Sequence, residues 1–151
     1  MTRPRIQNLT GALRRDRGSY ALETAVLAPV LIALLGLMVA FGRVIDADGA
    51  VDAAAHAAAR AASLERDASS AQSEAQAAAT SSLQGDGITC QTSSVVVDTA
   101  GYTLDVGQDA TVTVTIACTA RLDDIGLPGL TGSKTLTASA ISPIDTYRGR
   151  Q

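Results

Sequence analysis

Aromatic side chains are scarce in this sequence of 151 residues. It contains one Phe, three Tyr and no Trp. A core without large aromatic rings buries little apolar area per residue. A part of about one hundred residues outside any membrane segment also buries only about 60–65% of its surface on folding. We therefore expect that part to need a covalent link or neighbouring subunits for stability.

No arrangement typical of an active site is present either. The single His56 has no second candidate ligand set nearby, no nucleophile lies in a recognisable elbow, and no Gly-rich loop joins a strand to a helix. Asp46, Asp48 and Asp52 superficially suggest a calcium loop, but the later ligands and the closing Glu are missing. Asp52 and His56 are expected to form a surface pair of little energy. We expect no enzymatic activity, no metal, no cofactor and no small-molecule substrate.

Charge is limited and uneven. The net charge is −3, which argues against nucleic-acid binding. Five basic residues precede the first long apolar run, and only Arg43 and Arg60 follow it closely. The five are Arg3, Arg5, Arg14, Arg15 and Arg17. Because short basic segments stay in the cytoplasm, we expect a cytoplasmic N-terminus and an extracytoplasmic C-terminus.

The sequence is rich in one thing above all, an uncharged apolar run from Thr24 to Gly42. A helix over residues 19–42 would be roughly 36 Å long, enough to cross a hydrocarbon core of about 30 Å. Glu23 places one carboxyl a turn into this helix. Pro29 removes the backbone bond to the carbonyl of Ala25 and is expected to kink the helix.

An Ala-rich helical region is predicted after the membrane segment, at 43–84. Small side chains recur every three or four residues on one face, as in a helix packed on one side at close range. They are Val44, Ala47, Val51, Ala54, Ala58 and Ala62; polar Asp48, Asp52, His56 and Arg60 follow another face. A second helix is expected over 67–83, with Asp67 as its N-cap and 85–87 as its end.

Three strands are predicted in the last part of the chain, over 88–98, 110–122 and 133–141. Cys90 and Cys118 lie in the first two, and an even pair beyond a membrane segment predicts a disulfide. Placing Cys90 opposite Cys118 sets Val96 opposite Val112, with the loop centred near Leu104. The expected core is Ile88, Val96, Val112, Val114, Ile116, Leu136 and Ala138 against the Ala face of the helix.

The sequence thus predicts an α+β fold: a long membrane-spanning helix that continues into a small extracytoplasmic antiparallel sheet domain. Residues 1–18 are a basic, flexible cytoplasmic leader and 19–42 the transmembrane helix. Residues 43–84 are the Ala-rich helical region, and 85–151 form the β domain with its disulfide.

The motif with the most specific content lies at the border between the basic leader and the apolar helix. There the sequence runs Arg17-Gly18-Ser19-Tyr20-Ala21-Leu22-Glu23-Thr24. A Gly followed five positions later by Glu at such a border resembles the prepilin-peptidase site of type IV pilin-like proteins. With Pro29, Arg43, Asp46 and the stretch 52–60, the segment from about Arg15 to Leu64 resembles the TadE-like pseudopilins of tight-adherence pilus systems.

The resemblance implies cleavage after Gly18, which leaves Ser19 as the new N-terminus and Glu23 as the fifth mature residue. It also implies the partners: the membrane, a prepilin peptidase, other pilin-like subunits and the tight-adherence assembly machinery. An isolated ammonium in or near the apolar layer is costly. Glu23 lies about 6 Å further along the helix axis, where its carboxylate would neutralise the amine of its own chain or of a displaced neighbour.

Two departures favour a minor component over a major fibre subunit. Flp-type pilins have Tyr after the Glu, where this chain has Thr24, and the first mature residue would be Ser19 where classical type IV pilins begin with Phe. Two other interpretations remain open. One is a membrane-anchored extracellular binding module that is neither processed nor assembled. The other is a secreted protein with a signal peptide, against which stand Glu23 and the lack of a small-residue cleavage site.

Overall fold

The structure, a computed structural model, describes residues 13–122 and 131–147. The chain divides into two compact units, Met1–Val39 and Ala40–Gln151. The elements follow in the order α1, α2, β1, a 3₁₀ turn, β2 and β3. The fold class predicted from the sequence is confirmed, because a long apolar helix precedes a small three-stranded antiparallel sheet with a disulfide.

The first unit consists, over its described residues, of the N-terminal part of helix α1, Leu13–Ser63. The helix assignment continues through Pro29. It begins at Leu13, earlier than the predicted start near Ser19, so residues 13–18 are helical. The reason is local: residues 13–17 are Leu, Arg, Arg, Asp and Arg, with no Gly or Pro, and Leu and Arg are good helix formers. Residues 1–12 lie outside the described residues.

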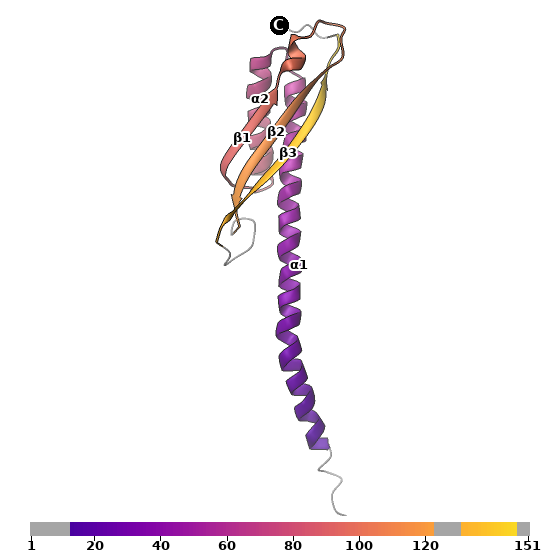
Figure 1. Cartoon of the computed structure of the whole chain (residues 1–151), viewed down its shortest axis with the longest axis vertical. Helices are drawn as coiled ribbons and strands as arrows, with labels where there is room; N and C mark the ends of the chain where they lie inside the picture. The colour runs from indigo at the N-terminus through magenta and orange to yellow at the C-terminus, as the bar shows by residue number, and fades with distance from the viewer. Residues whose placement is uncertain (1–12, 123–130, 148–151) are drawn as a thin grey trace, which may run out of the picture. The chain divides into compact units, whose positions relative to one another are not determined.

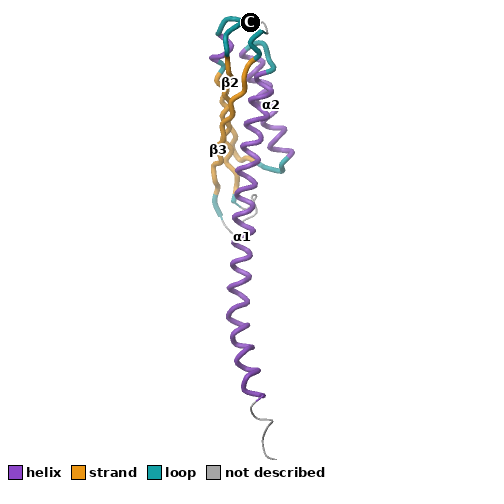
Figure 2. The backbone as a smooth tube through the Cα atoms, turned by 90° about the vertical axis from the view of Figure 1, so that its right-hand side faces the viewer, coloured by secondary structure: helices purple, strands orange, loops and turns teal. Residues whose placement is uncertain are grey.

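The second unit contains the last part of α1, from Ala40, and a second helix α2, Ala68–Gly85. Figure 1 shows the two helices behind the sheet, and Figure 2 shows them next to each other on one side of it. The predicted N-cap is confirmed: the Oδ1 of Asp67 accepts a hydrogen bond from the backbone N–H of Ser70 at 2.8 Å. This bond satisfies one of the free N–H groups at the start of the helix. A buried stripe follows at intervals of four residues, Ala71, Ala75, Ala79 and Leu83.

The sheet comprises β1, Cys90–Asp98, β2, Ala110–Arg121, and β3, Ser133–Ile144, in the order β1-β2-β3. Neighbouring strands are antiparallel. A 3₁₀ turn, Ala100–Thr103, connects β1 to β2. β3 runs three residues beyond the prediction and includes Pro143. Proline is tolerated in β3 because this strand lies at the edge of the sheet, where an N–H is not needed for pairing.

One face of the sheet packs on the two helices and forms the core. Val112, Val114 and Ile116 of β2 are fully buried, and Leu136 of β3 is nearly so. The helices contribute mostly alanine to this core: Ala47, Ala54, Ala55, Ala58, Ala59, Ala62, Ala71, Ala75 and Ala79, with Val51 and Leu83. The small face predicted on α1 is thus the packed face, and its lack of bulk lets helix and sheet backbones approach closely.

The register predicted between β1 and β2 is wrong. Cys90 pairs with Ala120, and Val96 pairs with Thr115 instead of Val112. The pairing shifts between Cys90 and Thr92, so the strand carries a bulge there. A bulge adds one residue, which reverses the faces of the residues on either side of it relative to each other.

Because of the bulge, the predicted core is wrong at Val96. Val96 points outward and is 62% exposed, whereas Val95 and Val97 are partly buried against the core. Ile88 and Ala138 are partly buried as well. The alternation within β1 is present as predicted, but one extra residue in the strand changes which of the alternating residues face the core. Because of the bulge, Cys90 and Val95 lie on the same face of the strand.

The predicted disulfide is confirmed between Cys90 and Cys118, whose Cα atoms are 5.4 Å apart. It joins β1 to β2 across 28 residues of sequence. On the chain-entropy model, closing a loop of this length stabilises a domain by about 3–4 kcal/mol. For a unit with a core built largely of alanine, this is a large part of the net stability.

We expect reduction of the disulfide to lower the free energy of unfolding of the second unit by about 3–4 kcal/mol. Urea titration of the detergent-solubilised chain, followed by circular dichroism with and without reductant, measures this change. The variant with both Cys90 and Cys118 replaced by Ala serves as the control, and reductant should leave its curve unchanged. An identical midpoint for the oxidised and reduced wild-type chain would contradict the prediction.

The N-cap of α2 should make stability depend on pH in the acid range. The hydroxyl of Ser69 and the backbone N–H of Ser70 donate to the carboxylate of Asp67 and lower its pKa from 3.8 to about 2. A group whose pKa is lower in the folded state than in the unfolded state stabilises the fold at pH values above its unfolded pKa. This stabilisation is lost as the pH falls through the folded pKa. The urea concentration at the unfolding midpoint should therefore decrease as the pH is lowered from about 4 to about 2. Asp67→Asn retains a capping oxygen without titrating, so its pH profile should be flatter; superimposable profiles would contradict this assignment.

Candidate membrane span and processing segment

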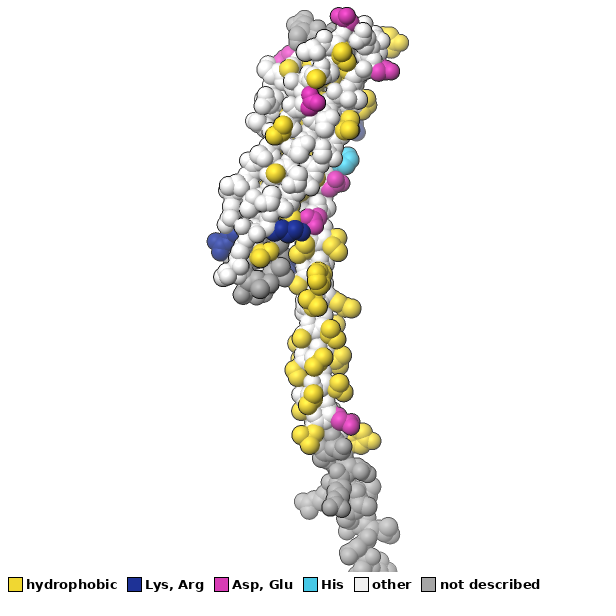
Figure 3. Space-filling model, in the orientation of Figure 1, with side chains coloured by type: hydrophobic (Ala, Val, Ile, Leu, Met, Phe, Trp, Pro, Cys, Tyr) yellow, Lys and Arg dark blue, Asp and Glu magenta, His cyan; other side chains and the backbone are white. Residues whose placement is uncertain are grey.

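The surface of α1 from Tyr20 to Phe41 is apolar apart from Glu23 and Thr24. Every large hydrophobic side chain in this stretch is between 52% and 73% exposed. Figure 3 shows these side chains around the described part of the helix. They are Tyr20, Leu22, Val26, Leu27, Val30, Leu31, Ile32, Leu34, Leu35, Leu37, Met38, Val39 and Phe41. An exposed apolar surface of this extent needs a bilayer or other proteins to cover it.

Among the described residues, α1 is the one helix that is long and apolar enough to cross a membrane, over Leu22–Ser63 by length and composition. The most apolar window of this helix is not buried against any other part of the chain. This separates it from the core helix of a soluble protein, which is mostly buried, whereas a signal sequence near the N-terminus meets the same criteria of length and composition. The finding supports membrane anchoring and carries no information on orientation.

Gly18 and Ser19 lie within α1, and Glu23 lies one helical turn further on. Residues four apart in a helix share a face, so position 19 and the Glu23 carboxyl are neighbours along the helix surface. Glu23 is exposed, and it is the one charged residue between Tyr20 and Gly42. The helix thus provides the spacing that the processing motif requires, while cleavage itself stays a prediction.

Thr24, the residue that differs from Flp-type pilins, has its polar group satisfied within the helix. Its hydroxyl donates to the backbone carbonyl of Tyr20 at 2.8 Å. Threonine commonly bonds to the carbonyl four residues earlier in this way. This bond lowers the free-energy cost of placing the hydroxyl in an apolar environment, because a polar group without a hydrogen-bond partner is unfavourable there. The expected kink at Pro29 stays a prediction.

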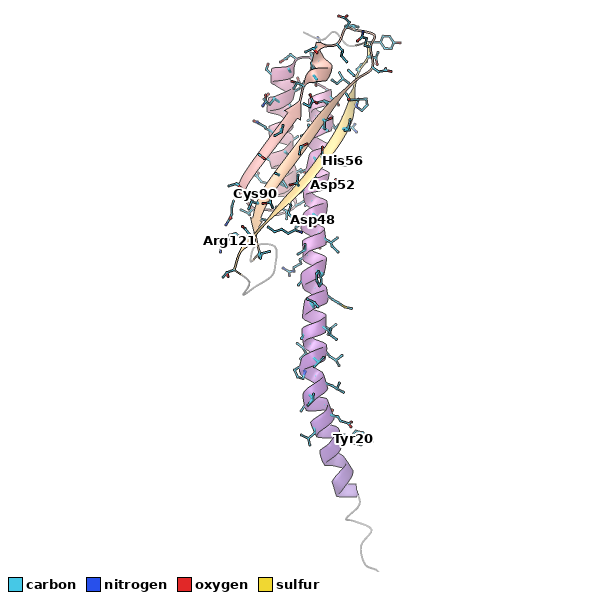
Figure 4. The ribbon with its side chains drawn as sticks, viewed as in Figure 1. Tyr20, Asp48, Asp52, His56, Cys90 and Arg121 are labelled. Carbon is cyan, nitrogen blue, oxygen red and sulfur yellow. A yellow bond between two sulfur atoms is a disulfide. The ribbon has the colours of Figure 1, made fainter. Side chains whose placement is uncertain are left out.

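Polar residues of α1 beyond the apolar run make surface contacts (Figure 4). The Nζ of Lys134 on β3 lies 3.3 Å from the carboxylate of Asp48. The Nδ1 of His56 lies 3.0 Å from the carbonyl of Asp52 and 3.5 Å from its carboxylate, and both side chains are exposed. The predicted surface pair is thus present. No group of three or more His, Cys, Asp or Glu side chains that could hold a metal ion occurs within residues 13–122 and 131–147.

The structure also brings together residues that the sequence analysis did not connect. A groove of about 790 Å³ lies between α1 and the turn that joins α2 to β1. Arg43 and Asp46 line it from α1, and Asp86, Gly87 and Ile88 line it from the turn. The turn sequence 85–87 was recognised as a helix end, but no local pattern predicts which part of α1 it faces.

A buried contact at the other end of α1 was also missed. The hydroxyl of Tyr102, in the 3₁₀ turn, donates to the backbone carbonyl of Ala62. The same carbonyl also accepts a hydrogen bond from the backbone N–H of Glu65 at 3.0 Å, so Tyr102 is a second donor to it and ties the 3₁₀ turn to the end of the helix. The 3₁₀ turn fits there because Gly101 packs on β2, where an added Cβ would meet the carbonyl oxygen of Thr111. The signal available in the sequence was a single Gly-Tyr pair, which is too short to predict a contact forty positions away.

These features define an α+β protein with one candidate membrane-spanning helix ahead of a small disulfide-linked sheet domain. Residues 18–60 match the model of the family described as TadE-like protein. They therefore form a TadE-like segment, and the resemblance predicted from the sequence is confirmed over them. No curated protein and no solved structure matches the chain.

The matched segment contains the apolar part of α1 and most of its Ala-rich part. A TadE-like segment indicates a component related to the tight-adherence pilus, from a family that is structural and not enzymatic. It also indicates membrane-associated assembly with other pilin-like components. Both sheet-forming cysteines lie outside the match.

If the apolar run is embedded in a bilayer, a charge at its centre should be poorly tolerated. We expect Leu34→Arg to disfavour insertion by about 3 kcal/mol on the translocon scale. The fraction of chain resistant to alkaline carbonate extraction from membranes measures this. Ala57→Arg, on an exposed part of α1 beyond the run, is the control and should be extracted like the wild type. Equal resistance of Leu34→Arg and the wild type would argue against a spanning helix.

Proposed function

We propose that the chain is a TadE-like minor pseudopilin, a structural component of a tight-adherence, type IV-like pilus or secretion apparatus. Its apolar helix spans the membrane with the N-terminus in the cytoplasm, is processed after Gly18, and packs against other pilin-like helices. The match to the TadE-like family over residues 18–60, which begins at Gly18, is the observation that carries this proposal.

The proposed orientation rests on two independent properties. Basic residues are concentrated before the apolar run, and such segments are retained in the cytoplasm. The Cys90–Cys118 disulfide lies after the run, and disulfides persist in oxidising compartments outside the cytoplasm. Both properties favour an extracytoplasmic second unit.

The proposed processing step is hydrolysis of the peptide bond between Gly18 and Ser19 by a prepilin peptidase. It frees the α-amine of Ser19 at the border of the apolar layer, where an unpaired charge is costly. Glu23 lies on the same helix face one turn away, and its exposed carboxylate is available to this amine or to the amine of a neighbouring chain. Pairing between chains would align subunits along the helix axis during assembly.

The proposal of a minor component rests on the second unit. It has its own core, its own disulfide and two helical segments under the sheet. A major Flp-type pilin, in contrast, is expected to consist of little more than a helix. The alternative, an anchored extracellular binding module, predicts an intact leader and no role for Glu23.

The processing prediction is tested by expressing the chain with a C-terminal tag in a host that has the matching prepilin peptidase. Mass spectrometry of the purified protein should give a mature N-terminus at Ser19. Replacing Gly18 with Ile should block cleavage, because a bulky residue does not fit where the peptidase accepts glycine. Glu23→Gln should be cleaved normally but should recover fewer pilin-like subunits on the tag.

Thr24→Ser is the matched control for Glu23→Gln, since it retains the hydroxyl that bonds to Tyr20 and changes no charge. It should behave as the wild type in both measurements. A chain that stays in the membrane with its leader intact would contradict the pseudopilin proposal and favour the binding module. Normal partner recovery with Glu23→Gln would contradict the role proposed for the carboxylate alone.

A further inference from the structure

The groove between α1 and the α2–β1 turn has an unusual combination of charge and shape. Its volume of about 790 Å³ lies within the range of small-molecule sites, about 300–1,000 Å³. Its middle is lined by small residues that leave it open. The full lining is Arg43, Ile45, Asp46, Ala47, Gly49, Ala50, Ala53, Asp86, Gly87 and Ile88.

The position of the groove along α1 suggests what chemistry reaches it. Arg43 directly follows Gly42, the last residue of the apolar run, so the groove begins where a spanning helix leaves the hydrocarbon. This inference therefore rests on the membrane anchoring in the proposed function. Ile45 also lines the groove and is 68% exposed, which gives the groove an apolar lip at the depth of the lipid glycerol and headgroup.

Three charged side chains line the groove. Arg43, Asp46 and Asp86 make no side-chain hydrogen bond or ion pair with any residue that the structure describes. Elsewhere in the same unit Asp48 and Asp52 do find partners, in Lys134 and His56. One cation and two carboxylates that face a shared groove without pairing leave a site for a ligand with one anionic and one cationic group.

We propose that this groove binds the headgroup of a zwitterionic phospholipid with a primary ammonium, that is, a phosphatidylethanolamine. The guanidinium of Arg43 would bind the phosphate, and the carboxylates of Asp46 and Asp86 would accept hydrogen bonds from the ammonium. The order of charges fits. Arg43 lies about 4.5 Å closer to the apolar run than Asp46, and in the lipid the phosphate lies closer to the acyl chains than the ammonium does.

Charge complementarity distinguishes this ligand from other membrane lipids. An anionic headgroup such as phosphatidylglycerol carries no cation for the two carboxylates and would be repelled by them. A choline headgroup is cationic, but its quaternary nitrogen has no N–H to donate. Charge-assisted hydrogen bonds are about twice as strong as neutral ones, so the primary ammonium is the group that the groove favours.

The groove can be filled without disturbing the fold. A Cβ added at Gly49 meets no atom within 4 Å, and replacing an interior helical Gly favours the helix by up to about 1 kcal/mol. Gly49→Leu should therefore fold normally while its side chain occupies the groove. Ala57→Leu, on an exposed position of α1 outside the groove, is the matched control.

The experiment uses the full chain in nanodiscs of phosphatidylcholine that contain a minor fraction of either phosphatidylethanolamine or phosphatidylglycerol. Native mass spectrometry after release from the discs counts retained lipids. We expect preferential retention of phosphatidylethanolamine by the wild type and by Ala57→Leu. Gly49→Leu, whose side chain fills the groove, and Asp46→Asn/Asp86→Asn, which loses two carboxylates, should each retain at least about ten-fold less, since ten-fold corresponds to the loss of one charge-assisted hydrogen bond. Asp52→Asn is the charge control and should behave as the wild type.

Each of the following results would overturn the proposal of a headgroup site, and they differ in whether they also contradict the proposed function. Equal retention of all three lipids, or retention unchanged in Gly49→Leu, refutes the headgroup site and leaves the proposed function intact. Loss of pilin-like partners in Gly49→Leu without any change in lipid retention would identify the groove as a protein docking site instead. A chain that fails to enter the nanodiscs refutes both this proposal and the membrane anchoring on which it rests.

Discussion

The close packing of alanine faces against one face of the sheet is the contact on which the second unit depends. Where helix and sheet meet, α1 and α2 present almost only methyl groups, so β2 supplies most of the large side chains of the core. Val112, Val114 and Ile116 fill the space that alanine leaves. Each methyl buries little apolar area, and larger residues at these positions would strain the packing. The small core explains why a disulfide and the Tyr102–Ala62 hydrogen bond accompany it.

Much of this arrangement could be predicted from the sequence, because the signals are local and periodic. The small face of α1, the cap at Asp67 and the alternation of β2 each depend on residues within a few turns of helix or one strand. The register of β1 could not be predicted, because the bulge near Cys90 changes the phase by a single residue. Assuming direct opposition of Cys90 and Cys118 was reasonable, but a disulfide requires only that the two Cα atoms lie close.

The residues of the candidate sites also differ in whether the sequence could predict them. The segment from Gly18 to Glu23 could be recognised because its meaning lies in the spacing of residues along one helix. The groove of Arg43 and Asp86 could not, since it depends on where the α2–β1 turn meets α1, and this is set by the length of α2 and by the four-residue spacing of its buried stripe. Contacts between distant parts of a chain follow from packing, and no window of sequence contains them.

A change of environment within a single helix connects these observations. Up to Phe41 the large side chains of α1 are exposed on every side, whereas from Ala47 onward buried and exposed positions alternate as in an amphipathic helix. Between the two lie Gly42, Arg43 and Asp46, where apolar side chains give way to charge. With the membrane anchoring proposed above, these charged groups lie at the border between lipid and protein, where they are available to headgroups. On that proposal α1 has two kinds of partner, and the border between them is the place where a lipid and the folded domain meet the same residues.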